Sequence, residues 1–225
     1  DLHAFYGESH ILHGVNFDVK RGELVTLLGR NGAGRSTTLK SIMNMVGRRT
    51  GSIVINGNET LHMKPHHIPR LGIGYCPEER GIFASLDVHE NLLLPPTVRS
   101  GGMSLDEIYA MFPNLYERRR SQGTRLSGGE QQMLAMARIL RTGARMLLLD
   151  EITEGLAPVI VQKLAEVLVK LKERGMTIVL VEQNFRFAAP LADRHFVMDH
   201  GQIIEEITAA QLPSRREHLN SMLGV

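Results

Sequence analysis

The chain has 225 residues, of which 43% are hydrophobic and 22% charged, which is ordinary for a globular protein with a substantial core. Its formal net charge is only +2, so charge gives no case for nucleic acid as a partner. No apolar run approaches the ~18 residues of a membrane span, and the first residues lack the pattern of a secretory signal. We therefore expect a cytoplasmic chain. Because it begins without Met, we also expect residues to be missing from the N-terminus.

A predicted strand, a glycine-rich loop and a predicted helix follow one another early in the chain. Residues 24–28, LVTLL, read as a buried strand and run into GRNGAGRST. The next segment, STTLKSIMNMV, has apolar residues at helical spacing. This is the context of a phosphate-binding loop with the pattern G-x-x-x-x-G-K-[ST]. Gly29, Gly34 and Ser36 keep that pattern. Arg35 stands where lysine is usual.

The middle of the chain changes from strand patterns to helical ones. Residues 51–57, GSIVING, predict a strand closed by an Asn-Gly turn, and residues 71–76 are another strand candidate. From 86 to about 122 the pattern is helical and more polar. The sequence SLDE at 104–107 predicts a capping box, and Pro113 must kink or end the helix that follows. We expect a helical insert in an α/β core.

Strands and helices alternate in the second half of the chain. A predicted helix, GEQQMLAMARIL, stops at Gly143, and the apolar run MLLLD at 146–150 is typical of a central parallel strand. Pro158 opens an amphipathic helix that reaches Gly175, and TIVLVE is the next central strand. HFVMD and QIIEE predict a hairpin around residues 200–201. This alternation predicts a mostly parallel sheet with helices on both faces.

Two further features complete a site for nucleotide hydrolysis. Asp150 ends the apolar strand and would help to hold Mg²⁺ with the Ser36 hydroxyl, while Glu151 would polarise the attacking water. The motif LSGGEQQ at 126–132 places two glycines before a helix, where free N–H groups bind anions. Two anion-binding helix ends but a single phosphate loop predict a dimer, with each nucleotide between the two subunits.

The chain resembles the ATP-binding-cassette (ABC) ATPases over essentially its whole length, because LSGGEQQ is highly specific for them. The stretches GYCPEERGIFASLDVHENL, LLLDEITEGLAP and LVEQN resemble the ATPase subunits of branched-chain amino acid importers, closest to the LivF type. Urea-importer ATPases of the same family are hard to separate from these. The resemblance implies an α/β P-loop NTPase fold with a mostly parallel core sheet, an antiparallel β subdomain and a helical subdomain. We expect one domain over 1–225, with 1–85 and 123–225 forming the core and β subdomain and 86–122 the helical subdomain.

The resemblance also assigns roles to residues. Tyr6 would stack on adenine, with an ordinary surface tyrosine as the alternative. Glu78, where Gln is usual, would lie between nucleotide, metal and permease, and Gln183 would take the switch position that is His in many relatives. Ser127, Gly128 and Gly129 would bind the γ-phosphate held by the opposite subunit, and residues 154–157 would lie at the dimer seam. ATP and Mg²⁺ are implied, the ATP being held by Gly29, Asn31, Gly32, Gly34, Arg35, Ser36 and Thr37, with Arg35, Glu151 and Gln183 as catalytic residues.

The implied function is an energy-coupling subunit at the cytoplasmic face of the inner membrane. Two ATPase subunits, alike or related, would dock beneath two membrane permeases served by a solute-binding protein. A soluble cassette ATPase of translation or repair is an alternative, but such chains usually carry two cassettes or long coiled-coil inserts. Arg35 motivates a third reading, a regulatory module with weak turnover, since guanidinium is longer, planar and forked where lysine presents a compact ammonium.

Three other features have simpler readings. Cys76 is the only cysteine, so no disulfide forms within the chain, and we expect a small buried filler. His62 and His66 have i,i+4 spacing, but Pro65 lies between them and a surface loop is the better reading than a metal site. Ile152 replaces the proline that commonly follows the Asp-Glu pair, from which we expect a packing effect only.

Overall fold

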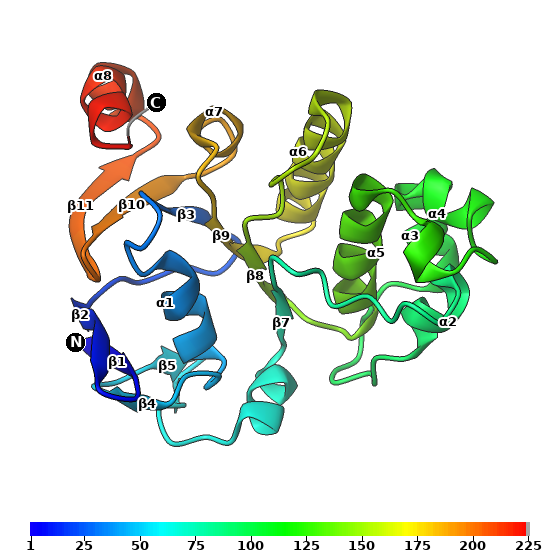
Figure 1. Cartoon of the computed structure of the whole chain (residues 1–225), viewed down its shortest axis with the longest axis horizontal. Coiled ribbons are helices and arrows are strands. Elements are labelled where there is room, and N and C mark those ends of the chain that lie inside the picture. The colour runs from blue at the N-terminus through cyan, green and yellow to red at the C-terminus, as the bar shows by residue number, and fades with distance from the viewer. Residues whose placement is uncertain (224–225) are drawn as a thin grey trace.

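A six-stranded sheet forms the centre of the protein in a computed structural model that describes residues 1–223 (Figure 1). All neighbouring strands run parallel except the last two strands in the sequence, which form an antiparallel hairpin. The mostly parallel sheet and the hairpin at residues 200–201 are therefore confirmed. The strand order is β11 (Gln202–Thr208), β10 (Arg194–Asp199), β3 (Leu24–Gly29), β9 (Thr177–Val181), β8 (Met146–Asp150) and β7 (Ile73–Cys76).

The central strands are apolar on both faces because both faces are covered. In β8, Leu147 and Leu149 pack into one core while Leu148 packs into the other, as the two-residue period of a strand requires. Two groups of elements enclose the sheet (Figure 1). One includes α5 (Gly128–Arg141), α6 (Pro158–Glu173), α7 (Phe185–Ala188) and α8 (Leu212–Leu223); the other includes α1 (Arg35–Ile42) and a small sheet of β2 (Ser9–Val15), β1 (Leu2–Tyr6) and β4 (Arg48–Thr50).

A short ribbon and a 3₁₀ helix precede the edge strand β7. β5 (Val54–Ile55) and β6 (Asn58–Glu59) pair in antiparallel fashion across Asn56 and Gly57, both in the left-handed region, so the predicted Asn-Gly turn is confirmed. The 3₁₀ helix η1 spans Pro65–Leu71. His62 and His66 are exposed, but His66 lies in this helix, so the expectation of a loop is corrected there. The two prolines of η1 fit a short 3₁₀ helix better than an α-helix.

Three short helices lie beside α5, at the right of Figure 1: α2 (Val88–Leu93), α3 (Leu105–Met111) and α4 (Pro113–Glu117). The predicted capping box holds, since Ser104 Oγ accepts from the N–H of Glu107 and the Glu107 carboxylate accepts from the N–H of Ser104. α3 ends at Met111, just before Pro113, as expected, and Pro113 begins α4. A 3₁₀ turn, η2 (Gly123–Arg125), then leads to α5. Among residues 1–223, no helix combines the length and the apolar character that crossing a membrane requires.

Cys76, at the end of β7, is fully buried. Its Sγ accepts a hydrogen bond from Gln132 Nε2 at 3.4 Å, and burial raises the pKa of the thiol to about 12. A thiol in this state is inert at neutral pH, so the prediction of a buried filler is confirmed.

Candidate functional site

The glycine-rich loop connects the central strand β3 to α1 through positions that only glycine fills without strain. Gly34 caps α1 with φ of 103°, and a Cβ there would lie 2.8 Å from a methyl carbon of Leu12. A Cβ at Gly29 would lie 2.5 Å from the carbonyl oxygen of Met198. The first N–H groups of α1 therefore stay close to the loop, where they form the positive end of the helix.

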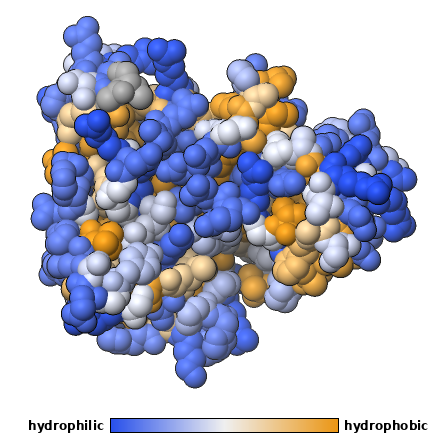
Figure 2. All heavy atoms as spheres, in the orientation of Figure 1, coloured by the Kyte–Doolittle hydropathy of each residue, from blue (hydrophilic) through white to orange (hydrophobic). Residues whose placement is uncertain are grey.

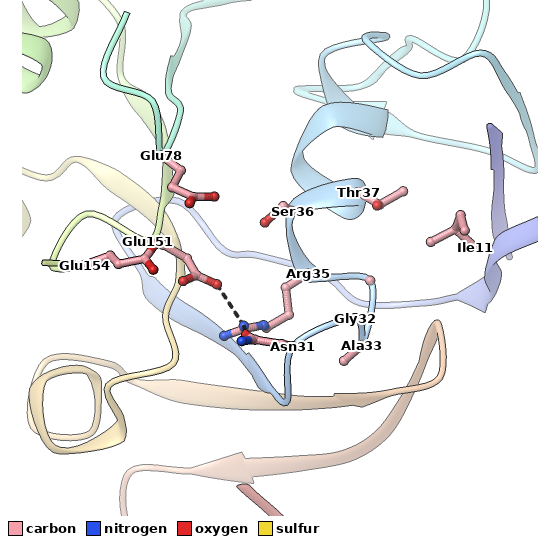
Figure 3. Close-up of a pocket in the computed structure, with 11 residues that line it drawn as sticks. Ile11, Asn31, Gly32, Ala33, Arg35, Ser36, Thr37, Glu78, Glu151 and Glu154 are labelled. Carbon is pink, nitrogen blue, oxygen red and sulfur yellow. Dashed lines mark hydrogen bonds and ion pairs between the residues drawn. The ribbon is translucent and has the colours of Figure 1, made fainter.

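This loop forms one wall of a cavity of about 410 Å³. The opposite wall carries three carboxylates, from Glu78, Glu151 and Glu154 (Figure 3). Ile11 from β2 adds an apolar contact beside the loop. The loop wall is lined by Asn31, Gly32, Ala33, Gly34, Arg35, Ser36 and Thr37. The structure thus brings the phosphate loop and the acidic end of β8 into one cavity, although more than 100 residues separate them in the sequence.

Ser36 and Asp150 join the two walls directly. Ser36 Oγ donates to Asp150 Oδ1 at 2.8 Å. The phenol of Tyr75, on the neighbouring strand β7, donates to Asp150 Oδ2 at 3.1 Å. Asp150 is only 1% exposed, and burial raises the pKa of its carboxyl group, while the bonds from Ser36 and Tyr75 oppose that rise. The position of Ser36 and Asp150 provides two hard oxygen ligands side by side, the kind that Mg²⁺ prefers.

Arg35 lines the cavity, but its side chain is almost fully buried. Its side chain is 4% exposed, and its Nη2 donates to Glu151 Oε1 at 2.8 Å and to Asn31 Oδ1 at 3.2 Å. The other terminal nitrogen, Nη1, is buried without a hydrogen-bond partner among residues 1–223. A buried guanidinium N–H without an acceptor is costly, so Nη1 marks a position where an acceptor oxygen would be stabilising.

Glu151 is held in an unusual backbone conformation. Its φ is 45°, in the left-handed region that costs a non-glycine residue about 1–3 kcal/mol. Its N–H donates to the carbonyl of Val181 at 2.9 Å, which fixes it at the carboxyl end of β9. Burial raises the pKa of the Glu151 carboxyl group and the Arg35 cation opposes that rise. Glu151 is therefore a carboxylate whose basicity depends on where Arg35 lies.

Glu78 and Glu154 both line the cavity. The neighbouring Glu154 carboxyl group is the main reason that the pKa of Glu78 is raised, with burial second. A Glu78 carboxyl group that keeps its proton adds no negative charge to a cavity suited to a phosphate chain. Sequence reasoning placed Glu78 near the site but did not pair it with Glu154, because nothing in the spacing shows that β7 and the segment after β8 converge there.

Several predicted site residues lie away from the cavity lining. Tyr6 is 43% exposed at the end of β1, and Gly29 is the last residue of β3. Gln183 is exposed in the segment after β9. The glycine turn at 127–129 begins α5, which lies on the other side of β7 and β8 from α1 (Figure 1). No residue of this turn lines the cavity of its own chain.

Glu182 is a further buried carboxylate that the sequence did not reveal. It is 2% exposed and accepts from Thr153 N at 3.0 Å and from Thr153 Oγ1 at 2.9 Å. Burial raises its pKa to about 7. Through these hydrogen bonds, Glu182 connects the segment that follows Glu151 to the segment that carries Gln183.

The family model described as ABC transporter matches residues 12–154. The chain belongs to this family. It is 39% identical over 224 residues, 98% of the chain and 96% of the relative, to the high-affinity branched-chain amino acid transport ATP-binding protein BraG of Pseudomonas aeruginosa. It is 35% identical to the probable branched-chain amino acid transport ATP-binding protein LivF of Archaeoglobus fulgidus, covering 100% of this chain and 97% of that one. It is 31% identical to the lipopolysaccharide export system ATP-binding protein LptB of Haemophilus influenzae, over 100% and 95% of the two chains.

Solved structures agree with this ABC assignment. The fold matches a structure of an ATP-binding subunit of an ABC transporter with a TM-score of 0.83 and 27% identity, covering 100% of this chain and 98% of that one. A dimeric post-hydrolysis state of an ATP-binding cassette, bound to ADP and Pi, matches with a TM-score of 0.80 and 26% identity over 92% and 95% of the chains. The predictions of the ABC fold, of an ATP-binding subunit and of an ATPase are confirmed.

Proposed function

We propose that this ABC ATPase is the energy-coupling subunit of an importer for branched-chain amino acids. The observation that carries the nucleotide site is the pair of contacts from adjacent loop residues to adjacent strand-end residues, Ser36 to Asp150 and Arg35 to Glu151. They set the phosphate loop and the catalytic carboxylates at hydrogen-bonding distance in one cavity. The triphosphate of ATP lies along residues 31–37, and Tyr6 and Ile11 contact the base and sugar from the β1–β2 hairpin.

Mg²⁺ fits the oxygen donors of this site. Ser36 Oγ and the buried Asp150 carboxylate supply two adjacent ligands, and Mg²⁺ typically combines one or two such groups with phosphate oxygens and water. When bound, the ion neutralises charge on the phosphates. Glu78 also lines the cavity, and its pKa is raised mainly by the neighbouring Glu154; once ionised it would contact water bound to the metal.

Arg35 and Glu151 act in sequence during hydrolysis. The unpartnered Nη1 of Arg35 is the donor that a γ-phosphate oxygen satisfies, because a guanidinium binds phosphate through two N–H groups. As Arg35 turns toward phosphate, its hold on Glu151 weakens. Glu151 then accepts a proton from the attacking water, and Gln183 donates to a phosphate oxygen. Turnover is slow, because most of this catalysis is positioning and the forked cation must leave a buried ion pair first.

The second half of each site comes from a second subunit. The glycine turn at 127–129 binds the γ-phosphate held by the partner, which is why it does not line the cavity of its own chain. The beginning of α6 next to it exposes hydrophobic surface, with Val159 70% exposed, and Figure 2 shows hydrophobic side chains over the upper end of α6. ATP closes the dimer and hydrolysis reopens it.

The membrane partners dock on the helical side. Leu93 and Leu94 at the end of α2 are about half exposed, at 49% and 48%, and Figure 2 shows a hydrophobic area between α5 and α2. We assign this area to two permeases, which place the ATPase at the cytoplasmic face of the membrane; a solute-binding protein acts on the far side. Helices α2–α4, with the rest of residues 86–122, form the helical subdomain that carries this contact.

Two experiments test this function. Purified chain is assayed for steady-state ATP hydrolysis with Glu151→Gln as the blank, and activity no higher than the blank would contradict hydrolysis. Affinity purification from membranes then identifies co-purifying subunits. Recovery of branched-chain amino acid permeases supports the proposal, whereas urea permeases or a lipopolysaccharide exporter would reassign the solute while leaving the ATPase intact.

One observation favours a second function, a nucleotide-binding module with little turnover. In the Arg35–Glu151 ion pair, the carboxylate proposed as the catalytic base already has a partner before nucleotide binds. Calorimetric ATP binding without activity above the Glu151→Gln blank would favour this module. Binding with measurable turnover would favour the importer ATPase.

A further inference from the structure

A second cavity, of about 350 Å³, lies at the opposite end of the sheet from the nucleotide site. It is reached from the amino ends of three neighbouring strands, because Gly72 precedes β7, Arg145 precedes β8 and Thr177 begins β9. Asp150, at the nucleotide site, lies at the opposite, carboxyl end of β8. The two cavities share no lining residue, so the second is physically separate from the first.

Three arginines line this cavity: Arg21, Arg99 and Arg145. No Asp or Glu lines it, and none of the three arginines forms an ion pair among residues 1–223, although other arginines of the chain do. Three like charges around one hollow repel one another. An anion in the hollow would replace that repulsion with attraction.

The backbone that carries these arginines is fixed. Val98 N and Arg99 N both donate to the carbonyl of Thr142, at 2.8 and 3.2 Å. Arg145 N donates to the carbonyl of Gly72 at 2.8 Å, and its own carbonyl accepts from Thr177 N at 3.0 Å. Arg99 and Arg145 therefore start from anchored positions, which lowers the entropy cost of closing on a ligand.

The side chain of Arg99 lies beside the lining residue Gly72, where a Cβ would be 3.1 Å from Arg99 Nη1. Arg145 lines the cavity too, and its Nη2 would lie 2.7 Å from a Cβ on Gly101, next to the lining residue Ser100. Arg99 Nη1 makes one long hydrogen bond, at 3.3 Å, to the carbonyl of Leu71. The remaining guanidinium N–H groups are available to a ligand.

We propose that this cavity binds a small anion with two or more negative charges, a phosphate ester or a polycarboxylate. Guanidinium groups match both chemistries, because their parallel N–H bonds fit carboxylate and phosphate oxygens. Asn56, Ser100 and Thr177 add uncharged hydrogen-bonding groups, and Val54, Ile55 and Met146 provide an apolar side for a short carbon skeleton. The volume suits a ligand of metabolite size. This site goes beyond the proposed transport function and does not depend on it.

The test is calorimetric titration of the full chain in metal-free buffer with saturating ADP, so that the phosphate loop is occupied. Citrate and inorganic pyrophosphate are the two probes, and the tighter one identifies which of the two chemistries the cavity prefers. We expect one binding site per chain. Arg99→Gln combined with Arg145→Gln should weaken binding about tenfold or more, the scale expected for losing charge-assisted hydrogen bonds.

The control variant removes two positive charges from positions outside the cavity. Lys170 on α6 and Arg216 on α8 are exposed and line neither cavity, so Lys170→Gln combined with Arg216→Gln should leave the affinity within about twofold. Arg99→Lys combined with Arg145→Lys keeps the charge but not the fork and should give an intermediate loss. The proposal is overturned if neither probe binds the wild-type chain, if the arginine pair variant binds normally while folded, or if the control pair loses affinity equally.

Discussion

Arg35 Nη2 lies 2.8 Å from Glu151 Oε1, so the cation of the phosphate loop forms an ion pair with the carboxylate that would activate water. Both side chains are largely buried, with 4% and 14% of their surface exposed. An ion pair in this setting resists disruption unless a new partner takes over the cation. A γ-phosphate is such a partner, so we expect ATP binding to release Glu151 first.

Replacing Arg35 with lysine should therefore speed hydrolysis. In Arg35→Lys the shorter, compact ammonium contacts phosphate without the Nη2 bond that holds Glu151, and we expect kcat to rise about tenfold or more. The affinity for ATP should change little, because the positive charge remains. Arg30→Lys makes the same chemical change at an exposed loop position and should leave kcat alone. An unchanged or lower kcat in Arg35→Lys would show that the guanidinium does not restrain the base.

Tyr75 should influence the metal site through Asp150. Its phenol donates to Asp150 Oδ2 at 3.1 Å and helps to keep the pKa of that carboxyl group down. In Tyr75→Phe the loss of about 1 kcal/mol from this hydrogen bond should raise the Mg²⁺ concentration for half-maximal ATPase activity about fivefold. Tyr109→Phe removes a phenol that contacts only His89 by hydrogen bonding in the described chain and serves as the control. An identical Mg²⁺ requirement in both variants would exclude this role.

Glu78 should make ATP binding depend on pH. Its pKa is raised mainly by the neighbouring Glu154 carboxyl group, with burial second, so Glu78 loses its proton above the ordinary carboxyl range. As pH rises through this range, a negative charge appears beside the phosphate chain, and KM for ATP should increase. Glu78→Gln should remove the increase and lower KM at pH 8 roughly threefold, the size of a partly screened repulsion.

A matched variant is available next to this position. Glu79→Gln removes an adjacent exposed carboxylate that does not line the cavity, and its KM should follow the wild-type pH profile. If Glu78→Gln keeps that profile as well, ionisation of Glu78 does not affect ATP binding.

Most of the fold could be predicted from the sequence, because its strands and helices are marked by local sequence patterns. Unbroken apolar runs at 24–28 and 146–150 predict strands covered on both faces, and the capping box at Ser104 marks a helix start to the residue. The strand β1 (Leu2–Tyr6) was missed, because LHAFY is short and its second partner, β4, lies more than 40 residues further along the chain. Such distant pairing leaves no period in the sequence.

The loop and strand-end residues were also identified correctly as neighbours, but their contacts were not. Arg35 was expected to grip phosphate, and nothing in GRNGAGRST shows that its guanidinium turns back to Glu151. Tyr75 and Glu182 belong to apolar strand patterns, so sequence reasoning treated them as structural. Their importance comes from the strands beside them, which only the fold determines.

Glu182 should make folding stability depend on pH. Burial raises its pKa to about 7, above the ordinary carboxyl value near 4.3. Between these two values the folded chain holds a proton that the unfolded chain has lost, so this group's contribution to stability is fully present below about pH 4 and is lost as pH rises through 7. The difference between these two pKa values corresponds to an upper limit of about 4 kcal/mol in the free energy of unfolding.

The variant Glu182→Gln should abolish that slope while keeping an oxygen acceptor for Thr153. Urea unfolding at several pH values would measure it, with Glu173→Gln at an exposed site of α6 as the control. We expect the wild-type chain to lose stability relative to Glu182→Gln as pH rises from 5 to 8, and the control to follow the wild type. Parallel curves for all three proteins would mean that Glu182 is ionised in the folded chain throughout this range, and that its bonds to Thr153 offset the cost of burial.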